Sequence, residues 1–105
     1  MFWEIELKEN YDDNGYLYGW EYQEATGPFA VWVCECWEEL GCNAAWVAGV
    51  EPGTQVYPAD FDGVYLLGFA DSLAAAEEVA KAYRLEVGDT APNERVGQWF
   101  EVIET

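Results

Sequence analysis

Residues 64–85 read VYLLGFADSLAAAEEVAKAYRL, a run of strand-forming residues that passes through two polar residues into an alanine-rich segment. The apolar and β-favouring residues at its start predict a buried strand over 64–69. Asp71 or Ser72 can cap a helix, because each side chain can accept a hydrogen bond from the first turn. Apolar residues then recur at helical spacing and predict a helix from Ser72 to Leu85. These residues are Leu73, Ala76, Ala80 and Tyr83.

Five further segments carry strand patterns, through alternation or through enrichment in β-branched and aromatic residues. They are residues 2–8, 16–23, 29–37, 43–50 and 96–104. Residues 43–50 are ambiguous, because their alanines favour a short helix and their tryptophan and valines a strand; we expect the strand. The sequence thus predicts one acidic α+β domain over residues 1–105. Its expected architecture is an antiparallel sheet of five to six strands with one helix packed on one face.

The first two of these strands are expected to form a hairpin, because Asp12-Asp13-Asn14-Gly15 has the composition of a tight turn. Alternation places four aromatic residues on one face of the second strand. They are Tyr16, Tyr18, Trp20 and Tyr22. Large rings are usually buried, so we expect this stripe to pack in the core. If the rings were exposed, they would instead serve as interface anchors.

Cys34, Cys36 and Cys42 are an odd set, and the chain contains no histidine. The C-x-C-x5-C spacing matches no zinc pattern, and a fourth ligand is missing. We therefore expect reduced thiols that act as small buried hydrophobic side chains, and no bound metal. Asp60-Phe61-Asp62-Gly63 lacks the later positions of a calcium loop and reads as a solvated turn.

Charge is the strongest compositional signal: 21 Asp and Glu against four Lys and Arg give a formal net charge of −17. Such a protein repels nucleic acid and anionic membranes, so neither is expected to bind it directly. No apolar stretch approaches the roughly 20 residues that span a bilayer. Residues 1–6 lack the basic start of a signal peptide. We expect a cytoplasmic protein.

Catalytic groups are scarce. Histidine is absent, Ser72 is the one serine and is better placed as a helix cap, and the cysteines have no evident activating partner. The glycines do not have the spacing of a phosphate-binding loop. We expect a protein that is not an enzyme and needs no cofactor.

What remains is a set of carboxylates between large apolar residues on the expected strands and turns. Glu4 and Glu6 would share the outer face of the first strand, about 7 Å apart, and acids of the next strands would join them if the first three strands are neighbours. A rigid row of carboxylates can imitate a nucleic-acid backbone. The alternative is an ordinary solvated surface, which the scarcity of Lys and Arg disfavours. The candidate partner-binding residues are Glu4, Glu6, Asp12, Asp13, Glu21, Glu35, Glu38 and Glu39.

In size, acidity and lack of catalytic groups the chain resembles phage-encoded anti-CRISPR and anti-restriction proteins, many of which are small acidic inhibitors of host defence. This resemblance implies a decoy of DNA or RNA. Its partner would be a basic nucleic-acid-binding protein or complex, such as a CRISPR effector or a restriction enzyme.

Two other functions remain open. An immunity protein or antitoxin would neutralise a single basic nuclease toxin, with the same electrostatics and an interface anchored by aromatic residues. A housekeeping domain from a salt-loving organism would be acidic for solvation alone. The abundance of tryptophan and the excess of Glu over Asp fit that third reading poorly.

Overall fold

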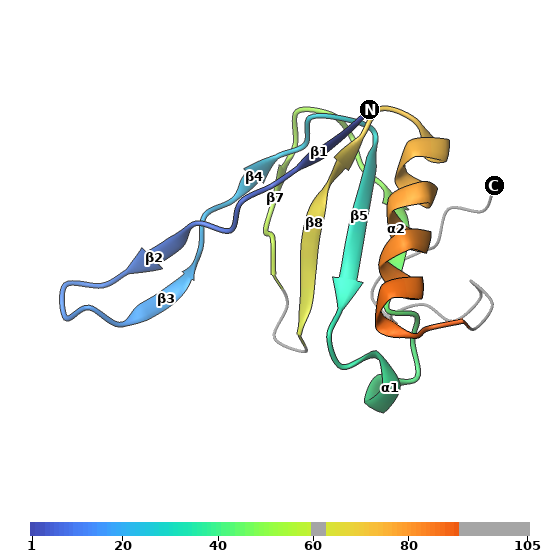
Figure 1. The fold of residues 1–105 in the computed structure, drawn as a ribbon. Coiled ribbons are helices and arrows are strands. Elements are labelled where there is room, and N and C mark those ends of the chain that lie inside the picture. The colour runs from blue at the N-terminus through green and yellow to red at the C-terminus, as the bar shows by residue number, and fades with distance from the viewer. Residues whose placement is uncertain (60–62, 91–105) are drawn as a thin grey trace.

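The computed structural model describes residues 1–59 and 63–90 as an α+β fold (Figure 1). Its main sheet has four antiparallel strands in the order β1-β8-β5-β6. Their bounds are Phe2–Glu4 (β1), Val64–Ala70 (β8), Phe29–Cys34 (β5) and Ala45–Gly49 (β6). The helix α2 (Leu73–Val87) packs on one face of this sheet, chiefly over β5 and β6.

Four shorter strands form two separate ribbons. β2 (Glu9–Tyr11) pairs with β3 (Leu17–Trp20), and β4 (Gln23–Glu24) pairs with β7 (Gln55–Val56), both antiparallel. A single-turn helix, α1 (Trp37–Leu40), connects β5 to β6. No helix in residues 1–59 and 63–90 is long and apolar enough to cross a membrane.

The core lies on both faces of the sheet because β5 is apolar along its whole length. Val31 and Val47 are fully buried on the face under α2, together with the small helix residues Ala76 and Ala80. Alanine on this side of the helix lets its backbone approach the sheet closely. The opposite face buries larger rings, among them Trp46. The ambiguous segment thus contains a strand, as expected, and its Trp46 and Val47 pair with β5.

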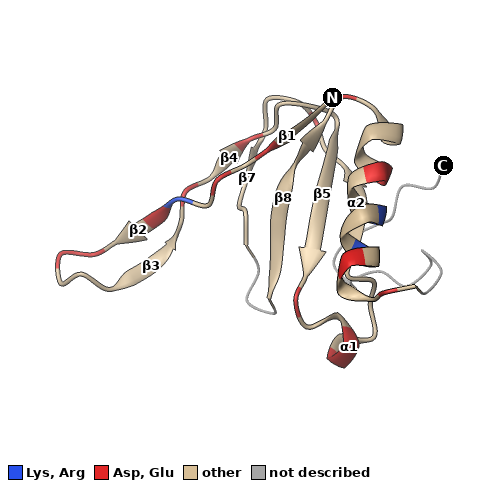
Figure 2. Cartoon of the chain, in the orientation of Figure 1, with Lys and Arg blue, Asp and Glu red and all other residues tan. Residues whose placement is uncertain are grey.

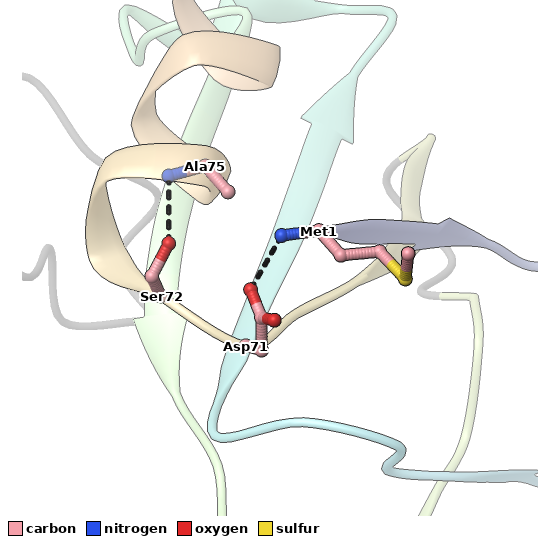
Figure 3. Close-up of polar contacts among 4 residues, drawn as sticks. All are labelled: Met1, Asp71, Ser72 and Ala75. Atoms are coloured by element: carbon pink, nitrogen blue, oxygen red, sulfur yellow. Dashed lines mark hydrogen bonds and ion pairs between the residues drawn. The ribbon is translucent and has the colours of Figure 1, made fainter.

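The strand-to-helix connection follows the sequence prediction closely (Figure 3). Ser72 is the N-cap of α2, and its hydroxyl accepts a hydrogen bond from the Ala75 amide at 3.2 Å. The neighbouring Asp71 carboxylate lies 2.5 Å from the N-terminal ammonium of Met1. This charge pair lowers the pKa of Asp71 through a direct hydrogen bond. It also ties the start of β1 to the end of β8.

A single sheet of five or six strands is not confirmed, because the main sheet has four in the described part of the chain. The strand expected over 96–104 lies outside the described residues. Three other strands are shorter than predicted: 2–8 contains β1 and then leaves the sheet, 16–23 is divided into β3 and β4, and 29–37 ends at Cys34. β3 and β4 pair outside the main sheet, whereas in 2–8 and 29–37 the strand pattern continues past the point at which the chain stops pairing with that sheet.

The burial predictions are partly wrong. Cys34 and Cys42 are buried free thiols, as expected, but Cys36 is exposed because β5 ends before it. The stripe expected in the core is largely exposed: Tyr16, Tyr18 and Tyr22 are 72%, 69% and 59% accessible. The physical reason is that β3 pairs with β2 in a hairpin outside the main sheet.

Candidate functional site

A two-stranded arm, residues 6–24, projects from the main sheet (Figure 1). β2 and β3 form its outer part, and the connecting segments continue side by side at its base. The Glu21 amide donates a hydrogen bond to the Lys8 carbonyl at 2.8 Å. Closer to the sheet, the Gln23 side-chain amide lies 3.5 Å from the Glu6 carbonyl. The arm is therefore a nearly continuous ribbon from sheet to tip.

The tip of the arm is a turn at residues 12–15, as the sequence predicts, although the strand that precedes it is β2 and not the predicted strand 2–8. One carboxylate oxygen of Asp12 accepts hydrogen bonds from the Asn14 and Tyr16 amides at 2.9 and 3.0 Å. Gly15 adopts a positive φ of 84°, a conformation that costs glycine little. Asp12 and Asp13 thus lie at the far end of the ribbon.

Tyr57, which follows β7, braces the arm from the side. Its hydroxyl accepts a hydrogen bond from the Trp20 amide at 3.0 Å, and its ring packs edge-on against Tyr22 with centroids 5.1 Å apart. Gly19 leaves room for this hydrogen bond, because a Cβ there would lie 2.9 Å from the Tyr57 hydroxyl. The arm is consequently held to the body by a defined contact.

Carboxylates are concentrated on this arm (Figure 2). Six acids and one lysine occur in residues 6–24, whereas the whole chain has 21 acids in 105 residues. The acids of the arm are all exposed. They are Glu6, Glu9, Asp12, Asp13, Glu21 and Glu24. In the described structure, the ribbon is therefore a narrow element with exposed carboxylates along its length.

A depression of about 340 Å³ lies where the arm leaves the sheet. Its lining includes the carboxylates Glu4, Glu6 and Glu24, with Lys8 as the cation beside them and Trp3 at the sheet end. Glu4 and Glu6 border the same depression, but β1 ends at Glu4, so they do not share the outer face of one strand as predicted. The extra member, Glu24, comes from β4 because β1 and β4 converge at the base of the arm.

The other three candidate residues lie elsewhere. Glu35, Glu38 and Glu39 are exposed at and after the end of β5, next to or within α1. The condition under which these acids would join Glu4 and Glu6, that the first three predicted strands are neighbours, is not met, because β8 separates β1 from β5. The eight predicted residues therefore form two groups: five on β1 and the arm, and three at the α1 end of the sheet.

Glu35 borders a second, mainly apolar depression of about 340 Å³. The walls of this depression come from the sheet, from the chain after β1 and from the base of the arm. They include Ile5, Leu7, Trp20, Tyr65 and Leu67. A single carboxylate beside apolar side chains can contact the cationic end and the aliphatic stem of a lysine or arginine, but it is not a catalytic pair.

Sequence reasoning missed Glu9 and Glu24 and assigned the tyrosines to the core. The Glu9 carboxylate accepts a hydrogen bond from the Tyr11 hydroxyl, which places charge beside an exposed ring. The available signal was the strong turn at residues 12–15, which predicts a hairpin. A hairpin signal does not say whether its faces pack on a sheet or point into solvent, so exposure could not be predicted from it.

The described residues offer little for catalysis. Burial, reinforced by a hydrogen bond with the Cys42 thiol, raises the pKa of Cys34 to about 12, so this thiol stays protonated and is a poor nucleophile. No group of three or more Cys, Asp or Glu side chains in residues 1–59 and 63–90 could hold a metal ion.

No family model matches the chain, and no curated protein or solved structure matches it either.

Proposed function

We propose that this protein is an acidic inhibitor that acts in the host cytoplasm by occupying the basic, nucleic-acid-binding surface of a defence protein. The partner would be a CRISPR effector or a restriction enzyme, and the protein would act as a decoy of DNA or RNA. The proposal includes no catalytic step and no cofactor. It is based on the resemblance in size and acidity to phage-encoded anti-CRISPR and anti-restriction proteins.

The observation that supports this proposal most directly is the acidic ribbon. A basic groove binds nucleic acid largely through charge, and a ligand must present several negative groups in a fixed order to compete for it. The arm presents six exposed carboxylates along a hydrogen-bonded ribbon, with Glu4 at its base. The acids at α1 would be a secondary contact at most, because they lie at another end of the sheet.

The test is a displacement assay in which labelled DNA or RNA is bound to purified CRISPR effector complexes and restriction endonucleases. Wild-type protein should release the nucleic acid from at least one of them. The double variant Glu4→Lys with Glu6→Lys should require roughly tenfold more protein for the same release. Its fold should be intact, because both side chains are exposed.

The matched control reverses two exposed acids of α2, Glu78→Lys with Glu86→Lys, and leaves the net charge equal to that of the test variant. Glu77 is unsuitable as a control because it is half-buried and burial raises its pKa. Equal potency of the two variants would reject the arm and its base as the contact surface. Failure of the wild-type protein to displace nucleic acid from any target would reject the decoy function.

A second candidate function is an immunity protein or antitoxin for one basic nuclease. The exposed tyrosines of the arm favour it, because a cognate interface is normally anchored by a few aromatic side chains. This function predicts one tight partner whose nuclease activity is lost on binding. It also allows the partner to keep its nucleic acid bound, which the decoy function forbids.

A further inference from the structure

We infer that the outer arm, residues 9–20, inserts into a cleft of the partner that is lined by arginine, with its tyrosine rings stacked on guanidinium groups. This inference rests on the proposed function and deepens it, because it names the side chains that recognise the partner and the chemistry of the partner's cleft. Charge alone would select any basic surface. Stacking would select arginine over lysine.

The first observation is the exposure of apolar area on a thin projecting element. Tyr11, Tyr16 and Tyr18 are 56%, 72% and 69% accessible, and Leu17 between two of them is 47% accessible. Scattered single hydrophobic residues on a surface need no explanation, but a contiguous group marks an interaction site. Here the exposed residues cover both faces of the narrow hairpin: Tyr11 pairs directly with Leu17 on one face, and alternation places Tyr16 and Tyr18 on the other.

The second observation is the pairing of rings with carboxylates. The Tyr11 hydroxyl is hydrogen-bonded to the Glu9 carboxylate, so an exposed aromatic ring lies beside a negative group. At the tip, Tyr16 follows the Asp12 turn directly. A guanidinium lying flat on a tyrosine ring gains cation–π attraction, and its edge can donate hydrogen bonds to an adjacent carboxylate. Lysine has no planar group, so it cannot stack on a ring and donate hydrogen bonds to the adjacent carboxylate at the same time.

The third observation is that the arm is organised before it binds. The Asp12 turn sets the tip, and the Tyr57 brace holds the base through the Trp20 amide. A partner would not have to order a loose loop, so less affinity is lost to entropy on binding. Tyrosine adds large contact area with few rotatable bonds, as it does in antibody loops.

The charge of the arm also limits which kind of partner it can bind. A second copy would bring Glu9, Asp12 and Asp13 of one arm against acids of another, which is repulsive. Single-stranded nucleic acid could stack on tyrosine, but its phosphates would be repelled. A protein cleft lined by arginine is the partner that can bind both the tyrosine rings and the carboxylates of the arm.

The experiment titrates the intact protein with polyarginine and polylysine of equal length at physiological ionic strength, with calorimetry as the readout. We expect polyarginine to bind roughly tenfold more tightly than polylysine. In Tyr16→Ser with Tyr18→Ser this preference should be lost, while polylysine affinity changes little. Tyr16→Phe with Tyr18→Phe should keep it, because the rings remain. The control Leu85→Ser with Val87→Ser removes two exposed apolar residues from α2 and should also keep it.

Equal affinity of the two polymers for the wild-type protein would overturn the inference, and so would a preference that survives the serine variant. Circular dichroism and the melting temperature establish that each variant is folded. Sedimentation of the free protein adds a further check: a dimer that the serine variant dissociates would make the arm a self-association element and overturn the inference. The displacement assay tests the decoy function separately, since charge-only binding to both polymers would leave that function standing.

Discussion

At Gly68, β1 passes too close to β8 to leave room for a side chain. Gly68 lies opposite Glu4 in the sheet, and a Cβ at this position would be 2.2 Å from the Trp3 carbonyl oxygen and 2.6 Å from the Phe2 ring. The obstacle includes backbone, which cannot rotate away as a side chain can. The position of Glu4, and hence the base of the arm, depends on the absence of a side chain at residue 68.

We predict that Gly68→Ala destabilises the protein by about 1–3 kcal/mol, the usual cost of forcing extra atoms into a packed site. Urea denaturation of the variant and the wild type measures the difference. The variant should also release less nucleic acid in the displacement assay, because β1 would have to move away from β8. Unchanged stability would show that β1 does not lie across Gly68 as described.

At the scale of the element, the arm depends on the contact between Gly19 and Tyr57. A Cβ at residue 19 would meet the end of the Tyr57 side chain, which can swing aside, so the cost to global stability should be small. The hydrogen bond to the Trp20 amide would then be lost. The outer arm would be held by its own ladder alone, and an isolated two-stranded hairpin is only marginally stable in water.

We therefore predict that Gly19→Ala speeds hydrogen exchange at the amides of β2 and β3, with little change at those of β5. Exchange read by mass spectrometry or NMR separates the two regions. Tyr57→Phe is the matched variant, because it removes the hydroxyl without adding a Cβ, and it should speed exchange at Trp20 in the same direction. Equal protection of the arm in all three proteins would mean that Tyr57 does not brace it.

At the scale of the whole molecule, stability should depend on pH through two carboxyls with opposite behaviour. Burial raises the pKa of Glu77 in the folded protein, so burying its ionised form at neutral pH opposes folding. This destabilisation is removed when Glu77 becomes protonated, as the pH falls toward the ordinary pKa of Glu. The N-terminal ammonium lowers the pKa of Asp71, so its contribution is complete above the ordinary pKa of Asp and is lost as pH falls below it.

We predict that the melting temperature rises between pH ~7 and pH ~5 and falls again below pH ~4. The fall in net negative charge acts in the same direction as Glu77 over the first interval. Glu77→Gln should reduce the rise on acidification, and added salt should reduce it further by screening. Calorimetry at matched ionic strength provides the measurement. A melting temperature that decreases steadily from neutral pH would contradict this assignment.

Local patterns in the sequence were sufficient to predict several elements. The strand and capped helix of residues 64–85, the Asp12–Gly15 turn and the strand nature of residues 43–50 all follow from propensity, periodicity and capping chemistry. The acidity and the lack of a histidine-based catalytic group are properties of composition. In each case the deciding interactions lie within a few residues of one another.

Long-range pairing decided the rest. Placing β8 between β1 and β5 separated Glu35, Glu38 and Glu39 from the acids of the arm, and no local pattern specifies strand order. The same is true of the tyrosines: alternation in residues 16–23 identifies a face, but only the pairing of β3 with β2, away from the main sheet, makes that face solvent-exposed. Composition and local pattern are enough to identify the acidic, aromatic and turn-forming residues. Only strand pairing places some of them on one projecting ribbon, because burial depends on which distant surface covers a strand.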